Sequence, residues 1–395
     1  MYIGFDGKRA VSNMTGLGNY SRLVIERLAL ENPQDKLLVY TPAMRDNPRL
    51  ETIRSAHNVE FRLPPPQGFK GSLWRTFGIS NNLKADKVDI FHGLSNELPL
   101  NIRKSGVPSV VTMHDVIYRT MPECYKPIDR KLYDFKYGAS CRNADRIIAV
   151  SERTKQDVVK FYGVDPDRID VIYQGCDESF RCVWSADELS ELRKRLNLPE
   201  KYILQVGTIE RRKNLELTVR ALPSLPMDIE LVVVGRDHHG YKKVVEDIAR
   251  ELGVTERIRY YEGLDFKDLP GVNQAAEVIA YPSRYEGFGI PVVEGLESRR
   301  PVVAATGSCL EEAGGPETLY VDPDSPNDMA AALIATLRGG REIDDMIAAG
   351  KEYAARFDKR RMATDIKATY EKAIESFQSE VKELNSKNGK KSLHN

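Results

Sequence analysis

The chain has 395 residues, and its 58 Lys and Arg residues balance its 58 Asp and Glu residues, so the formal net charge is zero. This length exceeds what one ordinary hydrophobic core needs and therefore predicts two domains. The hydrophobic share of 41% and the charged share of 29% are typical of a globular protein. A nucleic-acid-binding protein usually carries a basic excess, which this chain lacks, so we expect no nucleic-acid partner.

Targeting and membrane segments are not recognisable in the sequence. The strand-like run at 1–6 follows no basic and apolar leader. No stretch reaches the ~20 consecutive apolar residues that a membrane-spanning helix needs. The five cysteines are scattered and form no CxxC pair, which favours reduced thiols over a zinc site or disulfides. We therefore expect a cytoplasmic protein without a metal site.

The chain alternates short β-rich runs with helix-length segments. In the first half, strands are expected at 2–5, 36–40, 59–63, 89–93, 109–114, 146–151 and 170–174, and helices at 18–31, 129–143 and 152–162, the last capped by Ser151. In the second half, strands are expected at 202–207, 230–235, 257–263, 278–282, 301–305 and 319–322, and helices near 214–222, 241–252, 291–299, 326–338 and 342–355. This alternation predicts α/β architecture with parallel sheets and crossover helices.

These elements divide into two doubly wound domains that join in the irregular stretch 175–185. The first domain should cover 1–178 and the second 179–358. Segment 359–377 has a helical pattern, and the polar residues 378–395 should form a frayed or disordered tail.

The stretch "YEGFGIPVVE" at 285–294 follows an expected strand and holds two glutamates eight positions apart. Pro291 suits a helix start, which places Glu286 on the loop at the carboxyl edge of the sheet and Glu294 in the first helical turn. The N–H groups at the helix start can hold a diphosphate, and the two carboxylates can accept hydrogen bonds from sugar and ribose hydroxyls. The alternative is an ordinary loop glutamate followed by a helix glutamate that the macrodipole stabilises.

A second stretch, "QVGTIERRKN" at 205–214, places three cations between a strand and a helix. Arg211, Arg212 and Lys213 would suit a phosphate at the mouth of a parallel sheet. The alternative is a solvated basic turn.

Two stretches of the first half could also contact a ligand. In "NMTGLGNYSR" at 13–22, Gly16 opens part of a GxGxxG pattern, but Ser21 stands where the last glycine would be, so the loop could touch a phosphate or sugar or be a plain turn. In "VTMHDVIY" at 111–118, His114 and Asp115 end an expected strand, and His92 ends another. Such histidines bind hydroxyls or are satisfied structural residues.

Taken together, these stretches resemble the retaining GT-B glycosyltransferases of family 4, which include bacterial lipopolysaccharide and capsule mannosyltransferases. "YEGFGIPVVE" is similar to their E-x7-E motif, "VGTIERRKN" to their donor-phosphate loop, and "AVSERTKQDVVKFYGVDPDRIDVIYQGCD" to the segment that closes their N-terminal domain. The resemblance covers about residues 1 to 370. It implies two Rossmann-like domains that face a cleft, with helix 359–377 crossing back to the first domain.

The resemblance implies roles for the second domain. Glu286 would contact the donor sugar, Glu294 the nucleotide ribose, and Arg212 and Lys213 the diphosphate, with Arg211 as the alternative to Arg212. The backbone N–H groups of Gly287, Phe288, Gly289 and Ile290 would complete the diphosphate site.

It implies roles for the first domain as well. His114 would touch the donor sugar near the reacting carbon, and Gly16 would approach the donor, with Asp115 and His92 as weaker candidates. The family needs no divalent metal or other cofactor.

The implied reaction moves a hexose from a nucleotide-sugar donor, with GDP-mannose as first choice, to a glycan or lipid-linked acceptor in surface polysaccharide synthesis. Peripheral association with the inner face of the cytoplasmic membrane would use Phe69, Trp74 and Phe77 beside Lys70 and Arg75. The alternative for this segment, 64–78, is an acceptor-site loop packed on its own domain. Two other functions remain open, namely a sugar-nucleotide epimerase or hydrolase on the same fold and a non-catalytic nucleotide- or glycan-binding subunit.

Overall fold

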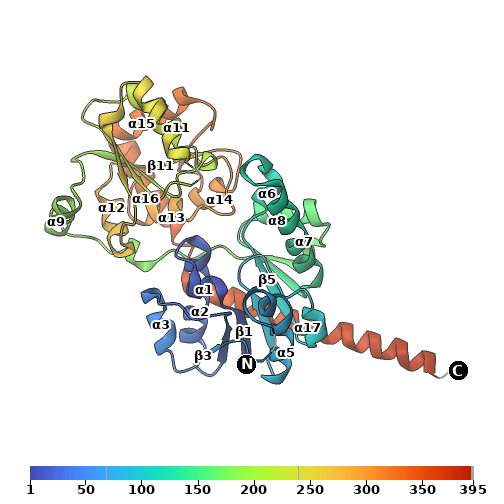
Figure 1. The fold of residues 1–395 in the computed structure, drawn as a ribbon. Coiled ribbons are helices and arrows are strands. Elements are labelled where there is room, and N and C mark those ends of the chain that lie inside the picture. The colour runs from blue at the N-terminus through green and yellow to red at the C-terminus, as the bar shows by residue number, and fades with distance from the viewer. Residues whose placement is uncertain (68, 239, 393–395) are drawn as a thin grey trace. The chain divides into compact units, whose positions relative to one another are not determined.

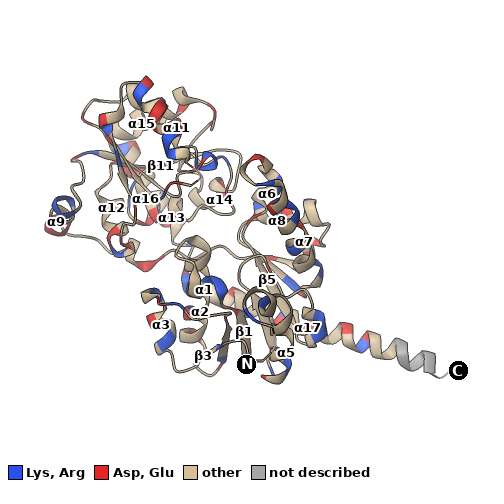
Figure 2. Ribbon diagram, viewed as in Figure 1, with Lys and Arg blue, Asp and Glu red and all other residues tan. Residues whose placement is uncertain are grey.

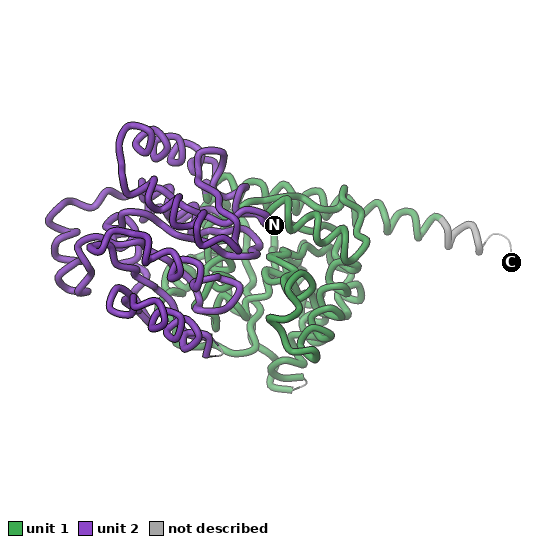
Figure 3. Tube along the Cα trace, turned by 90° about the horizontal axis from the view of Figure 1, so that it is seen from above, with its two compact units in different colours: residues 1–174, 359–395 green, residues 175–358 purple. Residues whose placement is uncertain are grey.

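The computed structural model describes residues 1–67, 69–238 and 240–392, with side chains described up to residue 386. The chain forms two compact units, which are unit 1 (residues 1–174 and 359–395) and unit 2 (residues 175–358) (Figure 3). The boundary proposed from the sequence, at 178, falls slightly later. The reason is that the amide of Cys176 already donates to the carbonyl of Phe357 within unit 2, at 3.1 Å.

Unit 1 is built on a seven-stranded sheet in the order β3-β2-β1-β4-β5-β6-β7, and all its strand pairs are parallel. Its strands are β1 (Tyr2–Asp6), β2 (Lys36–Tyr40), β3 (Val59–Arg62), β4 (Ile90–Gly93), β5 (Ser109–Met113), β6 (Arg146–Ala149) and β7 (Ile169–Val171). The strand order reverses between β1 and β4, and ligands of such sheets bind at the carboxyl edge beside this point.

Helices cover both faces of this sheet (Figure 1). On one face α2 (Gly16–Glu31) and α17 (Lys359–Ser392) contribute apolar side chains to a core with β1 and β2. On the other face α5 (Ile79–Ala85), α7 (Pro127–Asn143) and α8 (Glu152–Tyr162) enclose a second core. Ser151 caps α8 through a 3.0 Å hydrogen bond from the Thr154 amide, as the sequence predicts.

Helix α17 packs on unit 1 over its first half only. Ile366, Tyr370 and Ala373 are fully buried, whereas residues 378–386 are exposed. The prediction of a frayed tail from residue 378 was wrong, because the helix continues to Ser392. Glu, Lys and Leu favour the helix even without burial, and Glu380 pairs with Arg103 at 3.0 Å. Residues 393–395 lie outside the described part of the chain.

Unit 2 repeats the design with six parallel strands in the order β10-β9-β8-β11-β12-β13. They are β8 (Tyr202–Val206), β9 (Glu230–Val234), β10 (Ile258–Tyr261), β11 (Val278–Tyr281), β12 (Val302–Ala305) and β13 (Leu319–Val321). Helices α10 (Leu215–Ala221), α11 (Tyr241–Glu251) and α15 (Pro326–Arg338) build the core on one face. Helices α12 (Leu269–Ala275), α13 (Ile290–Glu297) and α16 (Arg341–Ala354) lie on the other (Figure 1).

The fold class predicted from the sequence is confirmed, since each of the expected strands is present and both sheets are parallel and doubly wound. Lys and Arg are interspersed with Asp and Glu over the helices of both units, in keeping with the balanced composition (Figure 2). No described helix is long and apolar enough to cross a membrane.

Candidate active site

The loops that follow β8 and β11 meet at the carboxyl edge of the unit 2 sheet. The two strands are neighbours at the point where the strand order reverses. The loop after β8 ends in the short helix η7 (Arg211–Lys213), and the loop after β11 leads into α13. Gly289 caps α13 with φ of 108°, and a Cβ there would lie 2.6 Å from Leu310 Cδ2, so the turn requires glycine.

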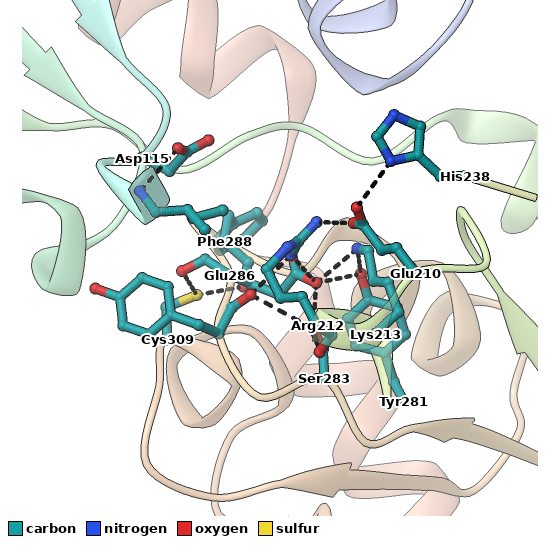
Figure 4. Close-up of polar contacts among 12 residues, drawn as sticks. Asp115, Glu210, Arg212, Lys213, His238, Tyr281, Ser283, Glu286, Phe288 and Cys309 are labelled. Carbon is teal, nitrogen blue, oxygen red and sulfur yellow. Dashed lines mark hydrogen bonds and ion pairs between the residues drawn. The ribbon is translucent and has the colours of Figure 1, made fainter. Parts of the chain in front are cut away.

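A buried ion cluster joins these two loops through the carboxylate of Glu286 (Figure 4). Its Oε1 lies 2.6 Å from Lys213 Nζ and 2.8 Å from Arg212 Nη1. The Ser283 hydroxyl donates to the same oxygen at 2.5 Å, and the Tyr281 hydroxyl donates at 3.2 Å. The two segments singled out from the sequence therefore converge within unit 2.

The structure brings Arg212 rather than Arg211 to this cluster. Arg212 Nη1 donates to the carbonyl of Tyr285 at 2.7 Å, and its Nη2 pairs with Glu210. Arg211 is exposed. Lys213 Nζ lies 4.9 Å from the centre of the Tyr281 ring and donates to the Tyr281 hydroxyl at 2.6 Å. Both cations are thus held in place before any ligand arrives.

The electrostatics of the cluster follow from burial and opposite charge. Burial alone would raise the pKa of Glu286, but Arg212 and Lys213 hold that pKa at about 2. Burial lowers the pKa of Lys213, against the attraction of Glu286. Glu286 is therefore a carboxylate throughout the neutral range and neutralises part of the positive charge of its two partners.

Glu294 occupies a different environment from Glu286. It is the fifth residue of α13, so the expectation that it lies in the first helical turn was wrong, because Gly289 takes the cap and the helix starts at Ile290. Among the described residues, no donor or cation contacts its buried carboxyl. Burial raises the pKa of Glu294 to about 8, and the negative charge of Asp177 acts in the same direction. The sequence-based alternative of a glutamate stabilised by the macrodipole does not fit a raised pKa.

The start of α13 leaves backbone donors open. The amides of Gly289 and Ile290 donate to no other described residue. Phe288 is buried, and its ring packs edge-on against Phe357 with centroids 5.2 Å apart. These amides form a place where an anion can bind, next to the cation cluster.

The raised pKa of Glu294 predicts a pH-dependent effect of Glu294→Gln on stability. Above pH 4.5, the ordinary value, the unfolded chain loses a proton that the folded chain keeps until about pH 8. The contribution of this group to stability therefore falls as the pH rises through that window. Replacing the Glu294 carboxyl by an amide should raise the free energy of unfolding by ~1–2 kcal/mol at pH 8, which corresponds to a rise of about 3–6 °C in melting temperature. At pH 5 the melting temperature should change little.

Thermal melts of wild type and variant between pH 5 and 8 measure this difference. Glu297→Gln is the matched control, because Glu297 lies on the same helix and is buried but pairs with Arg181 at 2.8 Å. That control should lose stability at both pH values. Parallel pH curves for wild type and Glu294→Gln would show that Glu294 is ionised in the folded chain.

In unit 1, His114 is positioned as a neutral imidazole at the end of β5. Its Nε2 lies 2.9 Å from the carbonyl of Leu94 and donates to it, and burial lowers the pKa of His114 to about 4. Nδ1 is left as an acceptor for a hydroxyl donor. Asp115 is partly exposed, and its Oδ1 accepts from the amide of Ile117 at 3.1 Å.

His92 does not fit the weaker site role considered for it. It is fully buried, with Nδ1 2.7 Å from the Tyr370 hydroxyl of α17 and Nε2 2.8 Å from the Thr112 hydroxyl. Burial lowers the pKa of His92 to about 3, so it is neutral. The structure supports the alternative of a satisfied structural histidine.

The glycines of the loop before α2 differ in what the structure requires of them. A Cβ on Gly18 would lie 1.9 Å from the carbonyl oxygen of Asn13, so packing explains this glycine. A Cβ on the exposed Gly16 would meet nothing within 4 Å, and Gly16 opens α2 without a side-chain cap. No contact with the described residues explains a glycine at position 16.

Comparisons with known proteins agree with this architecture. Residues 189–353 match the family model "Glycosyl transferases group 1", and residues 15–180 match "Glycosyltransferase Family 4". The chain belongs to the family 4 glycosyltransferases. It is 27% identical over 368 residues to O-antigen chain mannosyltransferase B of Escherichia coli, covering 89% of this chain and 94% of that protein. It is 30% identical over 293 residues to D-inositol 3-phosphate glycosyltransferase of Corynebacterium kroppenstedtii, covering 68% and 62%.

Solved structures show the fold of this glycosyltransferase to be GT-B. HepE from Anabaena, solved in complex with UDP and glucose, aligns with a TM-score of 0.75 and 20% identity over 93% of this chain and 99% of that one. The two family models and the named relatives, rather than this likeness of fold, show that the activity class is that of a glycosyltransferase.

The sequence did not single out three residues that hold the Glu286 cluster and its two loops together. Ser283 and Tyr281 both donate to Glu286. Asn214, fully buried with φ of 56°, donates to the carbonyls of Pro282 and Pro323 at 3.2 and 2.8 Å and so fastens the two loops. A signal for Ser283 was present in "YPSRYEGFG", where a hydroxyl stands just before the first glutamate. Among the described residues, no group of three or more His, Cys, Asp or Glu could hold a metal ion.

Proposed function

We propose that the protein transfers a hexose, with retention of anomeric configuration, from a nucleoside-diphosphate sugar to a glycan or lipid-linked acceptor in surface polysaccharide synthesis. GDP-mannose is the proposed donor, because the relatives named as mannosyltransferases in O-antigen synthesis include one matched over 94% of its length. The observation that carries the proposal is the buried Arg212–Glu286–Lys213 cluster beside the open amides of α13.

The chemistry needs positive charge where this cluster lies. During transfer, the bond from the anomeric carbon to the diphosphate oxygen breaks, and a bond to an acceptor hydroxyl oxygen forms. Negative charge accumulates on the departing diphosphate, and preorganised cations and amides stabilise it. Arg212, Lys213 and the amides of Gly287 to Ile290 would supply this stabilisation without a metal ion.

The remaining site residues would position the donor. Glu286 would accept a hydrogen bond from the sugar hydroxyls, and Glu294 from the ribose hydroxyls. His114 and Asp115 would meet the sugar from unit 1, and the open space at Gly16 would let its backbone approach the phosphates. Because His114 is neutral, its Nδ1 can accept a hydrogen bond from a sugar hydroxyl.

Nucleotide binding and product configuration test this function. A ligand that binds the folded state stabilises it by mass action, so GDP should raise the melting temperature more than UDP, ADP or dTDP. Turnover of GDP-mannose should release GDP and give an α-linked product, read from the anomeric proton by NMR. A larger rise in melting temperature with UDP than with GDP would show that the donor carries uracil and not guanine. Inversion at the anomeric carbon would contradict the retaining mechanism.

Peripheral membrane association is proposed through an exposed apolar surface of unit 1. Trp74 is buried and Arg75 is held in an ion pair, so the structure excludes both from the surface proposed for segment 64–78, of which residue 68 lies outside the described part. Phe69, Leu73 and Phe77 are exposed instead, and the rings of Phe69 and Phe77 lie 6.4 Å apart. Lys70 beside them could contact anionic headgroups.

We expect the protein to float with vesicles containing phosphatidylglycerol at low salt. The double variant Leu73→Ser, Phe77→Ser should lower the bound fraction at least ~3-fold. Each change removes apolar surface whose burial in the membrane would contribute about 1 kcal/mol or more to the binding free energy. Val183→Ser is the control, because Val183 is even more exposed than Leu73 and Phe77 but belongs to unit 2. Flotation that the double variant does not change would contradict this surface.

A further inference from the structure

Cys309 of unit 2 contacts the turn that leads into α13, although the mechanism proposed above does not use it. It follows β12 and precedes α14 (Leu310–Gly314), and its side chain is fully buried. Its Sγ lies 3.1 Å from the carbonyl oxygen of Glu286 and 3.1 Å from that of Phe288 (Figure 4). The thiol therefore joins the loop after β12 to two peptide groups of the loop after β11.

The thiol of Cys309 keeps its proton in the neutral range. Burial raises the pKa of Cys309 well above its ordinary value, and the negative charges of Glu286 and Glu312 act in the same direction. A protonated thiol can donate a hydrogen bond, whereas a thiolate would repel the two carbonyl oxygens. The single S–H proton is shared between the carbonyls of Glu286 and Phe288, which lie equally far from the sulfur.

Packing alone does not account for the position of this side chain. A buried cysteine often acts only as a small apolar group. An apolar group between two carbonyl oxygens would offer neither of them a donor, and buried polar groups without partners are costly. Leu310 already supplies an apolar contact to the same turn, since a Cβ on Gly289 would lie 2.6 Å from its Cδ2. Cys309 therefore contributes a donor to the turn as well as volume.

The two contacts fix the direction of two backbone N–H groups. In a planar trans peptide the C=O and N–H bonds point in opposite directions. The carbonyl of Glu286 belongs to the same peptide group as the amide of Gly287, and the carbonyl of Phe288 to the same peptide group as the amide of Gly289. Because both carbonyls point toward Cys309, both N–H groups point away from it. Neighbouring N–H groups that are aimed away from the chain in this way can bind an anion.

We propose that Cys309 is a positioning residue of the donor site, which aims the amides of Gly287 and Gly289 at the diphosphate of the donor. The inference rests on the proposed function, since it adds a residue to the same site. The thiol itself does not touch the donor. It orients the two N–H groups before the diphosphate arrives, and such preorganisation matters most as negative charge grows on the leaving group. Because a thiol is a weak donor, its loss should loosen the turn without unfolding unit 2.

Calorimetric titration of the full chain with GDP and UDP tests this role. Cys309→Ala removes the donor and should weaken binding of the preferred diphosphate about fivefold, the effect of one neutral hydrogen bond. Its kcat should fall by a larger factor than the affinity, because the charge on the diphosphate grows in the transition state. Cys309→Ser also shortens the side chain but keeps a donor, so it should bind more tightly than Cys309→Ala.

Infrared difference spectra test the hydrogen bond without any ligand. Subtracting the spectrum of Cys309→Ala from that of wild type isolates the S–H stretching band of Cys309. Cys141→Ala is the matched control, because the thiol of Cys141 is equally buried but donates to no other described residue. We expect the band of Cys309 at a lower frequency than that of Cys141, and diphosphate binding by Cys141→Ala like that of wild type.

These measurements separate the role of Cys309 from the proposed reaction. If GDP-mannose is not turned over, the titrations and the infrared spectra still decide whether the thiol positions the turn. Equal frequencies for Cys309 and Cys141, wild-type diphosphate affinity in Cys309→Ala, or binding by Cys309→Ser as weak as that of Cys309→Ala would each overturn the inference. Failure of both diphosphates to bind wild type would overturn the inference and the proposed function together.

Discussion

Lys213→Ala should reduce turnover about 100-fold and weaken nucleoside-diphosphate binding by at least about tenfold. One hydrogen bond between charged groups is worth about 1.5–3 kcal/mol, which corresponds to roughly 10–150-fold. Lys213 is already aimed at the site, since its Nζ lies 2.6 Å from Glu286 Oε1 and 2.6 Å from the Tyr281 hydroxyl. The loss should be larger in turnover than in binding, because the charge on the diphosphate grows in the transition state.

Two further variants make this result specific to the charge of Lys213. Lys213→Met keeps an apolar stem over the Tyr281 ring but removes the ammonium group, so it should behave like the alanine variant. Arg211→Ala removes the neighbouring exposed cation and should leave kcat and the diphosphate Kd within about twofold of wild type. Steady-state kinetics and calorimetric titration with GDP and UDP measure both quantities. If Arg211→Ala is impaired and Lys213→Ala is not, the phosphate contact has been assigned to the wrong side chain.

Local patterns in the sequence were enough to predict the two sheets. Continuous apolar runs such as 231–234 and 302–305 became the buried strands β9 and β12, because strands covered on both faces need apolar side chains throughout. Helix α9 (Ala186–Leu196) was not predicted, although Ser185 and Glu188 form a capping box that is readable as S-x-x-E. Helical propensity without burial was also underestimated at 378–392.

Long-range partners were not readable from the sequence. Glu286 and Lys213 lie 73 positions apart, and nothing local shows that they form an ion pair. The same limit applies to His92 and His114, which both end strands but differ in environment because Tyr370 of α17 contacts only His92. Arg75 is a third example. The sequence suggested an exposed residue, but Arg75 is buried in ion pairs with Asp6 and Glu97.

The two glutamates of "YEGFGIPVVE" should fail differently when each is replaced by glutamine. Glu286 would hold the reacting sugar, whose charge and geometry change at the transition state, so Glu286→Gln should lower kcat by about 100-fold. In the free protein Glu286 also competes with the diphosphate for Arg212 and Lys213, which lie 2.8 and 2.6 Å away. The same variant should therefore bind GDP more tightly than wild type does, even though it turns over slowly.

Glu294→Gln should instead raise the donor KM about tenfold, corresponding to ~1.4 kcal/mol, with kcat within about twofold of wild type. The ribose does not change during transfer, so contacts to it stabilise the bound donor and the transition state equally. Glutamine resembles the protonated carboxyl that a pKa of about 8 favours in the free protein, so the fold should tolerate it. Initial rates at saturating acceptor, with donor concentration varied, give kcat and KM for both variants. The same kinetic change in both would reject separate roles for sugar and ribose, and weaker GDP binding in Glu286→Gln would reject the competition for the two cations.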